Sequence, residues 1–287
     1  MPVPDWVDEV PLDPGPPHVR MGTRRIDVGD WLLVDGRRAD ELALKAELLA
    51  RRRREVVAVD PSRPSGEAQA ETLALVTAWL ADHGVGREPP GFEAADPGPT
   101  PAAHRAPDLE RAARLVQEDL CLMAMDDGPP VLVAAVLCFP SHWRLADKIG
   151  RPMAAIHAPV PDYASTLGDR PDRLLDGLTP GRIVARRNWS VHEGDALFAP
   201  DRLPPSTMTP AEVPRRLTLR SERQTLRRLE SGPVLFTIRV QQCPMGDLAT
   251  RPDLRARLAA AARAEAPERL DRIAGGQVDP LLAWLDA

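Results

Sequence analysis

Four strand-like segments in the second half of the chain restrict its fold more than any other feature. The clearest, SGPVLFTIRVQQ at 231–242, contains the β-branched and aromatic residues that strands favour. The segments at 181–192 (GRIVARRNWSVH) and 215–229 (RRLTLRSERQTLRRL) are also extended in character. The fourth, PPVLVAAVLCFP at 129–140, is apolar between bounding prolines, which is typical of a strand buried on both faces.

Helical patterns flank these strands. Apolar residues at helical spacing predict helices over 39–54, 65–82, 108–124 and 253–274. Short extended runs are expected at 26–28 and 31–34. Because helices come first, strands follow together and a helix ends the chain, the order predicts an α+β fold. Its sheet should be mainly antiparallel, with flanking helices and an N-terminal helical extension.

A Pro-rich stretch at 89–107, PPGFEAADPGPTPAAHRAP, suggests a surface linker or a long irregular loop. We therefore predict an N-terminal helical and Pro-rich region at 1–107 and a core at 108–287 that includes the C-terminal helix. The N-terminal region is expected to pack on the core, so that the two form one compact unit.

The charge balance argues against a nucleic-acid-binding protein. The 37 basic and 42 acidic residues give a net charge of −5, whereas nucleic-acid binders carry basic patches. The run of arginines at 51–54 is expected to be a solvated helix C-terminus, where the helix dipole favours positive charge. No stretch reaches the roughly 20 apolar residues of a membrane helix. The N-terminus also lacks the pattern of a signal peptide.

The cysteines argue against a protein-bound zinc or iron–sulfur centre. The chain has three cysteines, which are widely spaced and form no Cys-x-x-Cys pair or Cys/His cluster. We expect buried, reduced thiols in a cytoplasmic protein.

Polar residues alternate along two of the predicted strands. The segment 219–229 places Arg220, Glu222 and Gln224 on one side, because side chains alternate along a strand. In 185–192, Arg186 and Asn188 share one side in the same way. Two interpretations fit this pattern. The strands form a solvated, charged sheet edge, or they line a polar cavity that binds an oxyanion-type ligand together with a cation.

One histidine lies at a segment stiffened by prolines. In IHAPVPDY at 156–163, His157 precedes two prolines that restrict the backbone, so its imidazole loses little entropy on binding a metal. It could instead only cap the turn through backbone hydrogen bonds. His142 and His192 are the alternative ligand candidates.

Several segments resemble the haem-dependent oxidative N-demethylase-like family. They are CFPSHWRLADKIGRPMAAIHAPVP at 138–161, RRNWSVH at 186–192, RSERQTLRRL at 220–229 and SGPVLFTIR at 231–239. The opening PLDPG…DWLLVD is similar more loosely. The resemblance implies a PAS-like antiparallel sheet that holds one haem b, as in the alpha subunit of a dimethylamine monooxygenase.

The resemblance also implies a reaction and a partner. Reductive activation of O2 at the iron would oxidise a small secondary amine such as dimethylamine, and would yield a primary amine and formaldehyde. The electrons would come from a separate reductase with flavin and an iron–sulfur centre. This chain has no cysteine cluster or GxGxxG loop, so no flavin or iron–sulfur cluster is expected in it. A non-catalytic haem-binding PAS module that senses gas or redox state is the alternative, and a scaffold without haem is the third hypothesis.

Roles for individual residues follow from the resemblance. It implies His157 as the axial ligand of the haem iron. Arg186 would stabilise negative charge that develops at the reacting oxygen, and Glu222 would hold the ammonium form of the substrate or accept its proton. Arg220 and Gln224 could support or replace these two residues.

Other residues are expected at the edge of the site. Trp143 and Trp189 would wall the pocket, although both could also be core residues. Arg25, Lys148 and Arg227 are the cations that could pair with the haem propionates.

Overall fold

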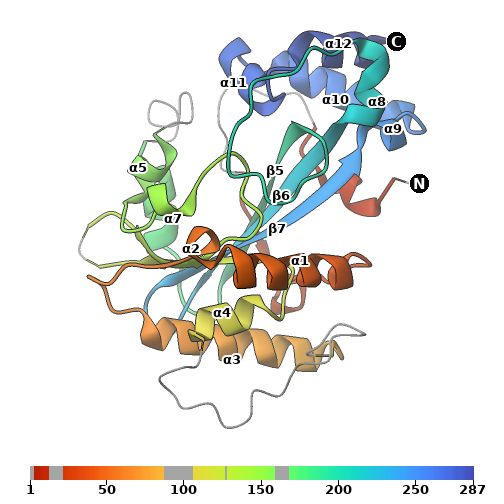
Figure 1. Cartoon of the computed structure of the whole chain (residues 1–287). Coiled ribbons are helices and arrows are strands. Elements are labelled where there is room, and N and C mark those ends of the chain that lie inside the picture. The colour runs from red at the N-terminus through yellow and green to blue at the C-terminus, as the bar shows by residue number, and fades with distance from the viewer. Residues whose placement is uncertain (1–2, 13–21, 87–105, 127, 159–167) are drawn as a thin grey trace.

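The computed structural model describes residues 3–12, 22–86, 106–126, 128–158 and 168–287 (Figure 1). Most of the expected linker at 89–107 lies outside these residues, so the domain boundary at 107 stays a prediction. Within the described residues, no helix is both long enough and apolar enough to cross a membrane. All three cysteines are buried and free, as expected for structural thiols.

The described residues contain a seven-stranded sheet in the order β1-β5-β6-β7-β3-β4-β2, and every neighbouring pair is antiparallel. The strands are β1 (Arg24–Ile26), β2 (Val57–Val59), β3 (Asp119–Ala124), β4 (Val131–Val136), β5 (Ile183–Glu193), β6 (Leu217–Arg228) and β7 (Val234–Pro244). The predicted α+β fold with an antiparallel sheet is confirmed. The four strand segments that led to that prediction became β4, β5, β6 and β7.

The helices form three groups around the sheet (Figure 1). The first contains α1 (Arg38–Arg51), α2 (Arg53–Val56), α3 (Gly66–Asp82) and α4 (Asp108–Ala113). The short α5 (Met153–His157) and α7 (Arg170–Asp176) lie beside the sheet. The third group lies near the C-terminus and contains α8 (Val213–Arg216), α9 (Met245–Leu248), α10 (Pro252–Ala264), α11 (Pro267–Ile273) and α12 (Val278–Asp286).

Two hydrophobic cores hold these groups in place. One joins the middle of the sheet to the first helix group and includes Trp31, Leu80 and Leu122. The other joins the far ends of β5, β6 and β7 to the C-terminal helices and includes Leu219 and Leu258. The long strands β5, β6 and β7 therefore run through both cores and make them one framework.

The prediction of a helix over 108–124 was wrong in its second half. The helix α4 ends at Ala113, and residues 119–124 form β3 instead. Every residue of β3 is buried, because the strand lies in the sheet between β4 and β7. The apolar residues whose spacing indicated a helix are buried in a strand that pairs with a neighbour on each side. Tertiary contacts therefore override the local sequence pattern.

Other elements differ in extent. The expected helix over 253–274 is divided into α10 and α11, and Pro267 begins the second piece because proline cannot continue the first. The extended run expected at 26–28 is displaced to β1, and the one expected at 31–34 is not a strand. The edge strand β2 was not predicted, since its three residues carry too short a pattern to recognise.

A buried ionic cluster lies where β7 meets α1. Arg239 is 1% exposed and pairs with Asp35 at 2.7 Å and with Glu41 at 2.8 Å. The Gln117 side-chain amide donates a hydrogen bond to the Glu41 carboxylate at 2.7 Å. Burial raises the pKa of Glu41, although Arg239 opposes this effect. The guanidinium therefore compensates a carboxylate that is shielded from water.

The substitution Arg239→Met is expected to lower the free energy of unfolding by about 3–5 kcal/mol, because it leaves the buried Glu41 without its cation. Urea denaturation measures this loss. The matched control is Arg51→Met on the exposed side of α1, whose pair with Glu47 is solvated and contributes little. A loss below about 1 kcal/mol for Arg239→Met would contradict the assignment.

Candidate functional site

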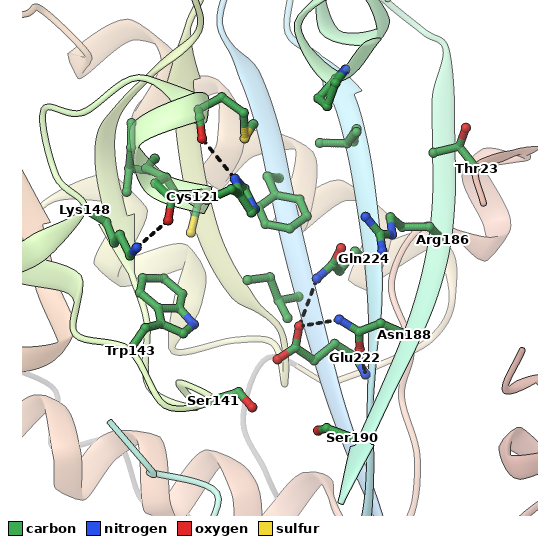
Figure 2. A pocket seen from close by; sticks show the side chains of 18 of the residues that line it. Thr23, Cys121, Ser141, Trp143, Lys148, Arg186, Asn188, Ser190, Glu222 and Gln224 are labelled. Atoms are coloured by element: carbon green, nitrogen blue, oxygen red, sulfur yellow. Dashed lines mark hydrogen bonds between the residues drawn. The ribbon is translucent and has the colours of Figure 1, made fainter. Parts of the chain in front are cut away.

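A cavity with a volume of about 510 Å³ lies against one face of the sheet. This volume is within the range of about 300–1,000 Å³ that is typical of small-molecule and cofactor sites. Strands β3 to β7 form one side of it, and the segment after β4, α5, α7 and α11 form the other. Figure 2 shows part of the lining. Its apolar residues include Met123, Leu132, Ile156, Leu174, Leu175, Val184, Leu226, Phe236 and Ile238.

The pairing of β5 with β6 brings the polar residues of both strands together. Arg186 lies opposite Gln224 and Asn188 lies opposite Glu222. All four line the cavity, because side chains of opposed residues project from the same face of a sheet. These four residues therefore line a cavity and do not form a solvated sheet edge, whereas the ligand expected there stays a prediction.

Two side-chain amides fix the carboxylate of Glu222. The Asn188 Nδ2 and the Gln224 Nε2 both donate hydrogen bonds to Glu222 Oε2, at 3.1 and 2.9 Å. The backbone N–H of Glu222 donates to Asn188 Oδ1 at 3.1 Å. Figure 2 shows these contacts beside Arg186. The carboxylate is thus held in one orientation, ready to accept a hydrogen bond or to pair with a cation.

Across the cavity, α5 ends at His157, which also lines the site. Its Nδ1 lies 3.0 Å from the carbonyl oxygen of Met153. A carbonyl only accepts hydrogen bonds, so Nδ1 carries the proton and Nε2 carries the lone pair. Burial lowers the pKa of His157, as do the positive charges of Lys148 and Arg186. The imidazole is therefore neutral, with the Nδ1–carbonyl contact that metal-binding histidines usually have.

The other two candidate histidines form a stacked pair at the cavity wall. The rings of His142 and His192 have centroids 4.3 Å apart and planes inclined by 10°. The Nε2 of His192 lies 3.0 Å from the hydroxyl oxygen of Ser141. Burial, followed by the positive charge of Arg220, lowers the pKa of His192 to about 2. His142 has a backbone φ of 59°, which is uncommon for a residue other than glycine.

The two tryptophans line the cavity, whereas Arg220 does not. Trp143 faces the strands from the opposite side (Figure 2), and Trp189 also packs in the C-terminal core. Arg220 is 0% exposed, and its guanidinium donates to the carbonyls of Phe139 at 2.8 Å and Leu197 at 3.2 Å. Arg220 therefore fixes these two segments against β6 and does not line the cavity.

The three cations expected to pair with the haem propionates do not lie together in the structure. Lys148 lines the cavity, while Arg25 and Arg227 do not. Arg227 instead lies over the ring of Trp31, 4.7 Å from its centroid. Three further arginines line the cavity. Strand alternation could not indicate them, because they come from a loop and a helix that are distant from these strands in the sequence. They are Arg202, Arg269 and Arg272.

Among the described residues, no group of three or more His, Cys, Asp and Glu side chains could hold a metal ion. The cavity lining offers the imidazoles of His142, His157 and His192, one oriented carboxylate, several cations and apolar walls.

The stability of the protein is expected to fall as the pH drops below about 6.5. In the folded state the pKa of His192 is about 2, so the imidazole stays neutral at mildly acidic pH. In the unfolded state the imidazole takes up a proton near its ordinary pKa of about 6.5. Between pH 6.5 and 5 this group alone removes about 2 kcal/mol of unfolding free energy. Urea unfolding of wild type and His192→Gln at both pH values measures the difference. An equal pH dependence in the two proteins would contradict this assignment.

Two comparisons with known proteins bear on identity. A comparison with curated proteins gave no match. The family model described as "Haem-dependent oxidative N-demethylase, alpha subunit-like" matches residues 22–271, which is most of the chain. The match includes the strands that line the cavity, α5, α7 and all but the last two residues of α11, so the chain belongs to the haem-dependent oxidative N-demethylase alpha-subunit-like family.

Proposed function

We propose that this chain binds one haem b in the cavity and acts as the O2-activating subunit of an oxidative N-demethylase. The features that carry the proposal are the neutral imidazole of His157 and the apolar cavity beside it. Haem needs an apolar slot, an axial ligand and cations for its two carboxylates, and the lining residues include all three kinds. His157 would be the axial ligand.

When bound, haem supplies the reductive activation of O2. The protein supplies binding and orientation. Glu222, whose Oε2 accepts hydrogen bonds from two amides, would bind the ammonium of a small secondary amine or accept its proton. Arg186, which faces the same space, would stabilise negative charge as it develops. Trp143 and Trp189 would exclude water from the amine.

We propose a substrate of the dimethylamine type. The balanced reaction converts dimethylamine, O2, two electrons and two protons into methylamine, formaldehyde and water. The name of the family implies a partner subunit, and a separate reductase with flavin and an iron–sulfur centre would supply the electrons. A cytoplasmic location is part of the same proposal, in keeping with three buried free thiols.

We also propose that the sheet is PAS-like. The support is the order of its five longer strands, β4-β3-β7-β6-β5, all antiparallel. The helices α5 and α7 fall between β4 and β5 in the chain and help to enclose the cavity.

The substitution Glu222→Gln is expected to reduce turnover by at least about tenfold, because an amide cannot pair with an ammonium or accept its proton. The measurement is formaldehyde release from dimethylamine by the haem-loaded protein with a surrogate reductase. Glu47→Gln, which changes an exposed carboxylate on α1, is the matched control and should retain wild-type turnover.

Two outcomes would count against the enzyme. Wild-type turnover in Glu222→Gln would remove the role of this carboxylate. Haem binding without turnover across a panel of small secondary amines would contradict the demethylase and favour the gas- or redox-sensing module.

A further inference from the structure

Most of the charged side chains among the described residues of the cavity lining are positive. Among the described lining residues, Glu222 is the one acidic side chain. Five cations share the lining with it, and these are Lys148, Arg186, Arg202, Arg269 and Arg272. Gathering like charges in a partly shielded space costs free energy unless an anion offsets it. A lining of mainly one sign attracts ligands of the opposite sign, so this cavity favours an anionic ligand.

Four of these cations lie apart from the sheet. Lys148 follows the short helix η4 (Leu145–Asp147), Arg202 lies in the segment after β5, and Arg269 and Arg272 are on α11. Arg269 and Arg272 are three residues apart, so they share one face of that helix. We call Lys148, Arg202, Arg269 and Arg272 the cationic rim. It is a composite site, assembled from three segments.

The arginines of the rim influence one another. Burial lowers the pKa of Arg272, and the positive charges of Arg202 and Arg269 lower it further. Arg202 pairs with the Asp271 carboxylate at 3.6 Å, and Arg269 pairs with Glu265 at 2.5 Å. Neither carboxylate belongs to the cavity lining. These pairs orient the two arginines from outside the cavity lining.

The rim is next to the imidazole of the site. The Lys148 ammonium donates to the carbonyl of Ile156, the residue before His157 (Figure 2 shows this contact). The charges of Lys148 and Arg272 are also among those that lower the pKa of His157. The imidazole of His157 and a set of cations therefore lie at neighbouring parts of one cavity.

We propose that the cationic rim binds the two propionates of haem b, and that haem thereby joins the C-terminal helices to the rest of the fold. This rests on the proposed haem site. Haem is an apolar disc with two carboxylates on one edge, and arginine suits carboxylates because its planar fork forms paired hydrogen bonds. α11 packs in the C-terminal core through Leu270, whereas Ile156 in α5 packs against the other core. One haem would therefore contact α11 of the C-terminal core and also α5, which packs against the other core.

The test compares two probes that differ only in charge. The haem-free protein is titrated with haemin and with haemin dimethyl ester, in which both propionates are neutral, and binding is followed by the Soret band. Wild type is expected to bind haemin at least about tenfold more tightly than the ester. The double variant Arg269→Gln/Arg272→Gln should lose most of that preference and keep its affinity for the ester. Hydrogen exchange should show that haemin protects α11 more than the ester does.

A matched control is Arg263→Gln on the neighbouring α10, because Arg263 is paired with Asp286 and lies outside the cavity lining. It should keep the wild-type preference for haemin. The comparison of the two probes on wild type needs no variant, so it remains decisive if the double variant does not fold.

Three results separate the possible failures. Equal affinity of wild type for haemin and its ester would overturn the propionate assignment and leave the haem site intact. Binding of neither probe would overturn the proposed function itself. The rim could instead bind a carboxylate of the substrate. In that case the double variant would keep its haemin preference and lose the spectral response to N-methylglycine but not to dimethylamine, which would also overturn the proposal.

Discussion

The pairing register of β5 and β6 is the constraint on which the rest of the site depends. It sets Arg186 opposite Gln224 and Asn188 opposite Glu222, on the face that lines the cavity. A shift of one residue would turn every one of these side chains to the other face. The eleven paired positions between the two strands, with β7 paired along the other side of β6, make such a shift costly.

Charged side chains on the sheet have two kinds of surroundings. Glu222 and Arg186 line the cavity, with amides and apolar residues around them. Arg239 instead pairs with two buried carboxylates, and Arg220, on the same side of β6 as Glu222, donates to backbone carbonyls. Buried ions of this kind need complete hydrogen bonding to be tolerated. The protein thus separates charges that hold its structure from charges that can act on a substrate.

Much of the strand side of the site could be predicted, because alternation along β5 and β6 assigns faces directly from the sequence. Alternation could not reveal that Arg220 is covered by the segments around Phe139 and Leu197, since that depends on distant loops. The rim could not be predicted either, because the arginines of α11 meet the cavity only through tertiary packing. The strand β3 was missed for the same kind of reason, as its partners β4 and β7 decide its conformation.

We propose that haem binds in the cavity with His157 as its iron ligand, and the absorption spectrum of the haem-loaded protein shows whether it does. Wild type, His157→Ala and His142→Ala should be expressed with a haem supply and compared at equal protein concentration. Both histidines line the same cavity, so His142→Ala is a matched control. The account predicts a Soret band in wild type and His142→Ala, and its loss or displacement in His157→Ala. An unchanged band in His157→Ala, with loss of the band in His142→Ala, would contradict it.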